Sequence, residues 1–168
     1  MSRRATGAEG VMQRLLFMVL WTAAVASAQQ APYIPDHQRT PGALNPEVTQ
    51  ENIRSTICSR GYTKQIRPPR YYTDKLKKKQ MHALALHGSP HDYEEDHLVP
   101  LCVGGAPHDV RNLWPQPRDG KWSAAAKDEL EESVCRQVCR GDLTLEQGRA
   151  IFLHPDWTQE WARYFNRQ

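Results

Sequence analysis

The chain has 168 residues, with 22 Lys and Arg, 19 Asp and Glu, four Cys and 39% apolar residues. This length suits one domain with a core of its own, and a formal net charge of +3 is too small to indicate nucleic-acid binding by the whole chain. The composition excludes a multi-pass membrane protein, a collagen-like chain and a cysteine-dense mini-scaffold.

Residues 1–28 are typical of a secretory signal peptide. They begin with basic residues, continue with an apolar run over 15–25 and end in Ala26-Ser27-Ala28, the small residues that a signal peptidase requires. The apolar run is shorter than the roughly 20 residues that span a bilayer, although an anchor or a buried helix is the alternative. Met12 is a second possible start. We expect an exported protein, periplasmic or extracellular, with no stable membrane insertion after cleavage.

Removal of residues 1–28 leaves 19 basic and 18 acidic side chains, a net charge of +1, and keeps all four cysteines. An even number of cysteines in an exported protein indicates two disulfides, for which three pairings are possible. Four buried thiols or a zinc site are the alternatives, although no Cys-x-x-Cys spacing is present.

The first part of the remaining chain predicts little regular structure. Prolines among polar residues predict a flexible leader over residues 29–45, followed by one domain over 46–168. Thr49 is a suitable N-cap for a short helix that reaches Cys58, and Thr73 is one for a helix over about 74–86. The basic stretch between these helices is expected to be rich in turns.

The second part predicts a small β element between helices. Two short strands, near 93–98 and 111–114, are expected on either side of a long loop, with Pro115 and Pro117 ending the second. Helices follow over 123–139, 145–153 and about 156–165. Ser123 and Gly141 mark the ends of the first of these, and Thr144-x-x-Gln147 is a capping box for the second. This order predicts an α+β fold.

One segment carries residues suited to catalysis. It contains Asp96-His97-x-x-Pro100, then Gly104-Gly105, then Asn112-Leu113-Trp114-Pro115. A neutral His is the natural general base near pH 7, a neighbouring carboxylate can hold a divalent cation, and an Asn can fix a loop by hydrogen bonds. On the following helix, Asp128 and Glu131 are three residues apart and share a face.

These residues resemble the signature of HNH endonucleases, which have a ββα-metal fold. With Thr56-Ile57-Cys58, Gly61-Tyr62-Thr63 and Arg67-Pro68, the likeness is to small secreted bacterial HNH-like proteins and covers roughly residues 45–160. It implies a disulfide-stapled domain with a ββα-metal core flanked by helices. It also implies a metal-dependent endonuclease that hydrolyses phosphodiester bonds of DNA or RNA.

The resemblance implies a role for each matching residue. His97 would be the general base, Asp96 a ligand of one divalent cation (Mg²⁺, with Mn²⁺ or Zn²⁺ possible), and Asn112 the residue that fixes the loop and orients His97. The third family position, on the helix, is usually His or Asn, and residues 121–139 contain neither. Asp128, and next Glu131, are the expected substitutes. A regular strand would point Asp96 and His97 to opposite faces, so we expect the strand to end or bulge there.

The missing His or Asn also supports the alternative function, a catalytically inactive secreted binding or structural module that retains the HNH-like fold. Residues 60–79 contain eight Lys and Arg against one Asp, which favours contact with nucleic acid through Arg67, Arg70, Lys75 and Lys78. A solvated helix face is the alternative. We prefer the disulfides Cys58–Cys139 and Cys102–Cys135. The oligomeric state is not predicted.

Overall fold

The computed structural model describes residues 33–166. Helices and two short strands follow one another in an order that confirms the α+β prediction. The elements are η1 (Gln50–Asn52), α1 (Tyr62–Ile66), α2 (Arg70–Ala83), η2 (Pro90–Asp92), β1 (Tyr93–His97), η3 (Leu101–Val103), η4 (Val110–Asn112), β2 (Leu113–Pro117), α3 (Ala124–Arg140), α4 (Leu145–Leu153) and α5 (Trp157–Phe165), where η denotes a 3-10 helix.

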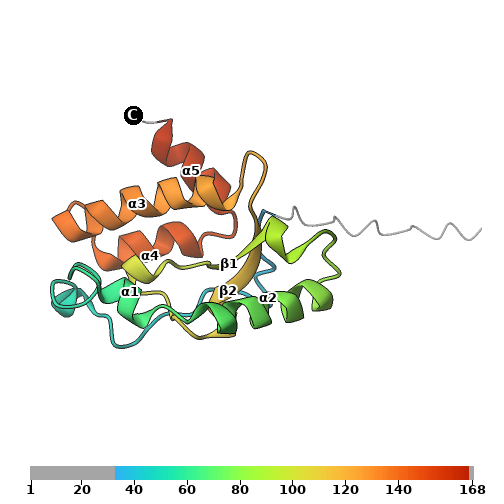
Figure 1. Cartoon of the computed structure of the whole chain (residues 1–168). Coiled ribbons are helices and arrows are strands. Elements are labelled where there is room, and N and C mark those ends of the chain that lie inside the picture. The colour runs from blue at the N-terminus through green and yellow to red at the C-terminus, as the bar shows by residue number, and fades with distance from the viewer. Residues whose placement is uncertain (1–32, 167–168) are drawn as a thin grey trace, which may run out of the picture.

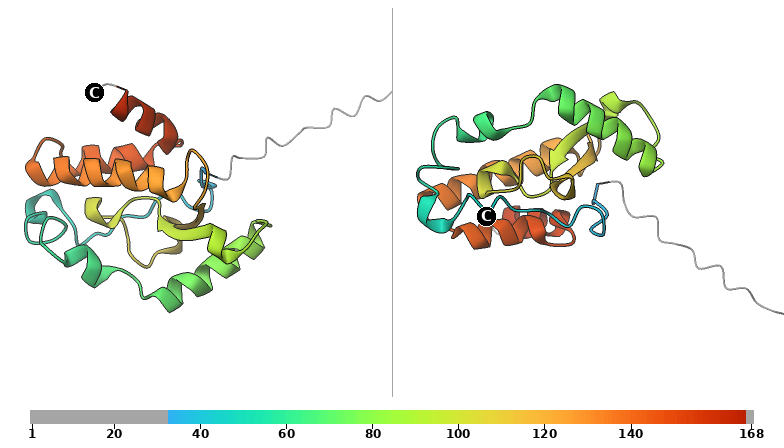
Figure 2. Two further views of the ribbon diagram at one scale, coloured as in Figure 1. Left: turned by 45° about the horizontal axis from the view of Figure 1, so that its top comes forward. Right: turned by 90° about the horizontal axis from the view of Figure 1, so that it is seen from below.

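The β1–β2 hairpin lies between two helical layers. Helix α2 packs against both strands, and α3, α4 and α5 pack against one another on the other side (Figures 1 and 2). The main core lies within that second layer, where Leu130, Val134 and Val138 of α3 meet Phe152 of α4 and Trp157 of α5. Because α3 is anchored by this apolar face, its N-terminal turns are held firmly beside the hairpin.

Local signals in the sequence place the three C-terminal helices well. Ser123 is the N-cap residue of α3, and Gly141 ends that helix with a φ of 89°, a left-handed conformation that glycine adopts without strain. Thr144 and Gln147 form the expected capping box of α4. The predictions for these helices are confirmed to within one residue at nearly every end.

The elements before the hairpin differ more from the predictions. Only η1 and a series of turns occupy the range of the helix expected up to Cys58, and α1 lies in the stretch expected to contain turns. Helix α2 begins at Arg70, before the expected N-cap Thr73, because Pro69 can precede the first helical residue without losing a hydrogen bond.

Strand β2 begins two residues later than the predicted 111–114, because η4 occupies Val110–Asn112, and it ends three residues later. It contains both Pro115 and Pro117, which pair with Glu95 and Tyr93 of β1. Proline is tolerated because the sheet has only two strands, so each strand has a free edge at which a missing N–H breaks no ladder. The two strands are antiparallel and in regular register from Tyr93 to His97.

Residues 33–45 include a hydrogen-bonded turn over 36–40, and they pack against the domain instead of forming the expected extended, flexible leader. Gly42 and Asn45 donate backbone hydrogen bonds to Arg111 and Gly104, and Leu44 pairs with Gly105. Thr40 is buried. Residues 29–32 and the proposed signal peptide over 1–28 lie outside the described residues.

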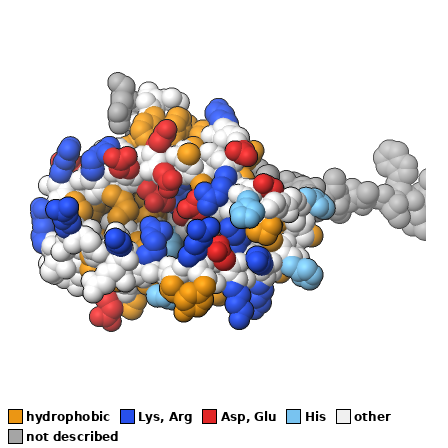
Figure 3. Space-filling view, in the orientation of Figure 1, with side chains coloured by type: hydrophobic (Ala, Val, Ile, Leu, Met, Phe, Trp, Pro, Cys, Tyr) orange, Lys and Arg blue, Asp and Glu red, His pale blue; other side chains and the backbone are white. Residues whose placement is uncertain are grey.

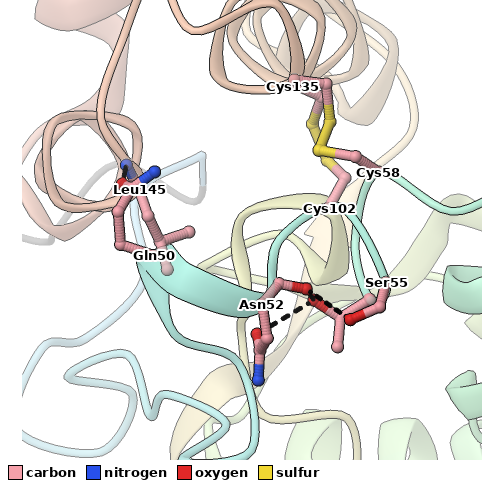
Figure 4. Close-up of a disulfide and its surroundings, with 9 residues drawn as sticks. Gln50, Asn52, Ser55, Cys58, Cys102, Cys135 and Leu145 are labelled. Atoms are coloured by element: carbon pink, nitrogen blue, oxygen red, sulfur yellow. Dashed lines mark hydrogen bonds between the residues drawn. A yellow bond between two sulfur atoms is a disulfide. The ribbon is translucent and has the colours of Figure 1, made fainter.

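Two disulfides join distant parts of the chain, as predicted. Cys58–Cys139 ties the turns after η1 to the end of α3, and Cys102–Cys135 ties η3 to the middle of α3. Cys135 and Cys139 are one helical turn apart on α3, so both bridges attach to the same part of that helix. Figure 4 labels Cys58, Cys102 and Cys135 in this region. The bridges therefore fix the loop between the strands against the helix that follows them. Among residues 33–166, no helix is long and apolar enough to cross a membrane.

Candidate active site

Strand β1 sends its side chains to two different environments. Glu95 and His97 are buried, and they alternate with Glu94 and Asp96, which are half-buried. The strand ends at His97, as expected, but its register is regular up to that residue, so no bulge brings Asp96 and His97 to one face. The two residues expected to work side by side therefore have separate partners.

Asp96 forms a buried ion pair with Lys127 of α3. The ammonium Nζ donates to Asp96 Oδ2 at 2.7 Å, to the backbone carbonyl of His97 at 2.8 Å and to Glu131 Oε1. Lys127 is fully buried. Burial alone would lower its pKa, but the attraction of Asp96 and Glu131 and the hydrogen bonds to them raise the pKa above the usual lysine range. Lys127 is therefore charged at any physiological pH.

The expected metal ligands do not fit a divalent cation as they stand. Lys127 lies between Asp96 and Glu131 and engages one oxygen of each, and Asp128 is exposed on α3. Partial burial and the nearby carboxylates of Asp96 and Glu94 raise the pKa of Asp128. Among residues 33–166, no group of three His, Cys, Asp or Glu could hold a metal. A role for Mg²⁺, Mn²⁺ or Zn²⁺ stays a prediction.

His97 is oriented by the loop between the strands. Its Nε2 lies 3.0 Å from the carbonyl of Pro107, and because a carbonyl only accepts, Nε2 carries the proton and donates. Burial, with the nearby charges of Arg67 and Lys127, lowers the pKa of His97 against the opposing effects of Pro107 and Asp96. The ring is therefore neutral near pH 7, with an unprotonated Nδ1.

Asn112 fixes that same loop. Its side chain accepts from the Val99 N–H at 2.8 Å and donates to the carbonyls of Val99 and Ala106 at 2.9 and 3.1 Å. Gly105 permits this close approach, since a Cβ there would lie 1.8 Å from the Val99 carbonyl oxygen. Asn112 is fully buried and thus acts on the loop, with an indirect effect on His97 through Pro107.

A basic pocket of about 910 Å³ lies beside β1 and contains His97 on its wall. Arg67 and the first nine residues of α2 contribute cationic side chains to it, and Arg118 adds another just after β2. Lys and Arg side chains are spread across the face seen in Figure 3 and surround several Asp and Glu side chains near its middle. The charged and histidine residues that line the pocket are Arg67, Arg70, Asp74, Lys77, Lys78, His91, Glu94, Glu95, His97 and Arg118. Asp74 pairs with Arg70 and Lys77, and Glu94 pairs with Arg118, which leaves Arg67 and Lys78 without a carboxylate partner among the ion pairs of the described residues.

Glu95 is an unusual member of this pocket. It is 9% exposed, and neither carboxylate oxygen has a hydrogen-bond partner among the described residues. Burial, reinforced by the charge of Asp96 and opposed by Lys77, raises the pKa of Glu95 to about 8. The carboxyl is therefore mostly protonated at pH 7, two residues from a neutral imidazole on the same face of β1.

The structure brings together some of the predicted residues and separates others. Arg67, Arg70 and Lys78 line the pocket with His97, whereas Lys75 is exposed on α2 away from it. Sequence reasoning missed Arg118 and Lys77 as pocket residues, and it missed Lys127 as the partner of Asp96. The alternation within β1 was the available signal for Glu95, because it places that residue on the face of His97.

Comparison of the chain with protein-family models, with curated proteins and with solved structures finds no match.

Proposed function

We propose that this chain is an exported endonuclease with an HNH-like ββα core, which hydrolyses phosphodiester bonds of DNA or RNA with His97 as the general base. The single observation that supports this most strongly is a neutral, oriented His97 on the wall of a basic pocket. Nucleic-acid phosphates are the anions that such a pocket favours. The hairpin, its long loop and α3 follow one another in the order of a ββα unit.

The chemistry follows from the tautomer of His97. Nδ1 takes a proton from a water molecule whose oxygen attacks phosphorus, while Nε2 keeps its hydrogen bond to Pro107. Cationic side chains such as Arg67 and Arg118 compensate the negative charge that develops on the phosphoryl oxygens. The bond from phosphorus to the leaving sugar oxygen then breaks, and that oxygen needs a proton.

Glu95 is the residue to which we assign that proton. It lines the same pocket as His97, and its raised pKa keeps it protonated where the imidazole is not. A neutral base and a protonated acid in one site are the complementary pair that phosphodiester cleavage requires. The two side chains are two residues apart on one strand face, roughly 7 Å along the strand, which leaves room for a phosphate between them.

The test is cleavage of plasmid DNA and of single-stranded RNA by the purified, oxidised protein, with Mg²⁺, Mn²⁺ or a chelator. We expect His97→Gln, which keeps a donor for Pro107, to lose roughly 100-fold or more in kcat. His82→Ala is the matched control, because His82 is exposed on α2 and does not line the pocket. Equal activity of wild type and His97→Gln under every condition would contradict the proposal.

The same assay separates the second functional class from the first. A binding module with this fold would retard labelled DNA or RNA on a gel in the presence of chelator, but neither wild type nor variants would shorten it. Glu95→Gln sharpens the distinction, since we expect it to reduce kcat while leaving gel retardation unchanged.

A further inference from the structure

Lys127 occupies a site of the kind that proteins use for a metal ion. Its ammonium has three N–H donors, and each has an oxygen partner: Asp96 Oδ2, the carbonyl of His97 and Glu131 Oε1. Nζ also lies 5.6 Å from the centre of the Phe152 ring, on whose face a cation is attracted. No part of Lys127 is exposed to solvent.

The partners of Lys127 are the ligands that hard cations prefer. Carboxylate and backbone carbonyl oxygens bind Mg²⁺, Ca²⁺ and Mn²⁺ in proteins. Here they come from the end of β1 and from the second turn of α3, the two elements on which the sequence places metal ligands. The ammonium thus stands where a divalent cation was expected.

We propose that Lys127 is a permanent internal cation that takes the place of a divalent metal ion in this core, so that Asp96 and Glu131 bind no metal in the native protein. A divalent ion could bind these oxygens only by displacing the ammonium, because two cations that share the same carboxylates would repel each other at short range. Displacement would leave a buried ammonium without its anionic partners, which is strongly unfavourable.

Lys127 is also a positioning residue for His97. By holding both the Asp96 carboxylate and the His97 carbonyl, it fixes the end of β1 to α3 at the point where the His97 ring enters the pocket. Helix α3 is itself held by its apolar core and by two disulfides. The ammonium therefore joins β1 to α3 permanently, because it is part of the chain. A metal ion would join these elements only while it was bound.

The experiment measures metal binding and stability, so that its outcome does not depend on nuclease activity. Mn²⁺ is titrated into the wild-type protein by calorimetry, and Tm is recorded in millimolar Mn²⁺, millimolar Ca²⁺ and chelator. We expect no one-to-one Mn²⁺ site and no shift of Tm among these conditions. Lys75→Ala, which removes an exposed lysine from α2, is the control and is expected to behave like wild type.

Lys127→Ala tests the same site from the other direction. It leaves two carboxylates and a carbonyl around an emptied space, so we expect Tm to fall by roughly 10 °C or more in chelator. Millimolar Ca²⁺ or Mn²⁺ should then raise Tm with concentration, because the metal binds only the folded state. Adding Asp96→Asn to Lys127→Ala should abolish that rescue.

Two results would overturn the proposal. One is a one-to-one Mn²⁺ site in the wild-type protein that Asp96→Asn removes, since the metal would then coexist with or displace Lys127. The other is a Lys127→Ala protein as stable in chelator as the wild type. If Lys127→Ala does not fold under any condition, the wild-type and Asp96→Asn titrations decide the matter alone.

Discussion

Asp96 and His97 are neighbours on β1, yet they lie in regions of opposite character. On the side of α3, Lys127 lies between the carboxylates of Asp96 and Glu131, and each N–H of the ammonium has an acceptor. On the side of the pocket, Glu95 has no hydrogen-bond partner among the described residues, and cationic side chains gather around an open volume. A satisfied buried network specifies structure, whereas unsatisfied groups beside a cavity are suited to a ligand.

The largest loss of stability should come from removing Lys127, whose ammonium holds Asp96 and Glu131 on the side of α3. Lys127→Met removes the ammonium but keeps much of its volume, and it leaves Asp96 and Glu131 facing each other without a counter-ion. We expect a loss of about 3–5 kcal/mol in the free energy of unfolding, measured in urea. Lys121→Met is the control on an exposed lysine just before α3, and a similar loss there would contradict the assignment.

A smaller loss is expected from the loop that orients His97. Asn112→Ala leaves the buried Val99 N–H without its acceptor and two carbonyls without a donor, for an expected loss of about 2–4 kcal/mol. Native-state hydrogen exchange should show faster exchange at the Val99 amide. Asn112→Asp keeps the acceptor for that amide, so it should preserve the protection of Val99 despite its own loss of stability.

On the side of the pocket, the contribution of Glu95 to stability should change with pH in the direction opposite to that of an ordinary carboxylate. Burial, together with the charge of Asp96 on the same strand, raises the folded-state pKa of Glu95 from 4.5 to about 8. The charge of Lys77 on α2 opposes this shift. Stability from its proton is therefore fully present below pH 4.5 and is lost as the pH rises through about 8.

Glu95→Gln removes that titration, because the amide does not ionise. We expect the free energy of unfolding of the variant to rise relative to that of the wild type between pH 5 and pH 9. At pH 9 the variant should be more stable by on the order of 2 kcal/mol, measured by urea unfolding. Glu129→Gln, on an exposed position of α3, should show no such trend. A difference in stability between Glu95→Gln and the wild type that does not grow over this pH range would contradict the raised pKa of Glu95.

The smallest expected effect is on DNA binding, and it distinguishes the basic residues of the pocket from the other basic residues of 60–79. Arg67→Ala should weaken binding to duplex DNA and reduce the slope of log K against log salt by about one, as expected for one lost phosphate contact. Lys75→Ala removes the same charge from a residue outside the pocket and should leave that slope nearly unchanged. Equal slopes for the two variants would indicate that the basic stretch acts only as a solvated face.

The amino-acid sequence by itself determined the features that depend on neighbours in the chain. The caps at Ser123, Gly141 and Thr144, the α+β order and the even number of cysteines follow from short-range rules. The role of Asn112 in the loop was also predicted, from the resemblance and from the ability of an Asn side chain to fix a loop by hydrogen bonds.

Only the tertiary structure decided the environment of each ionisable group. Lys127 and Glu131 are spaced as an ordinary surface ion pair, and nothing in that spacing shows that Asp96, 31 residues away, completes a buried triad. The pKa of Glu95 likewise depends on α2 and on burial between layers. Charge and hydrogen bonding act through space, so residues distant along the chain set the state of a site, whereas capping and helix formation act within a few residues.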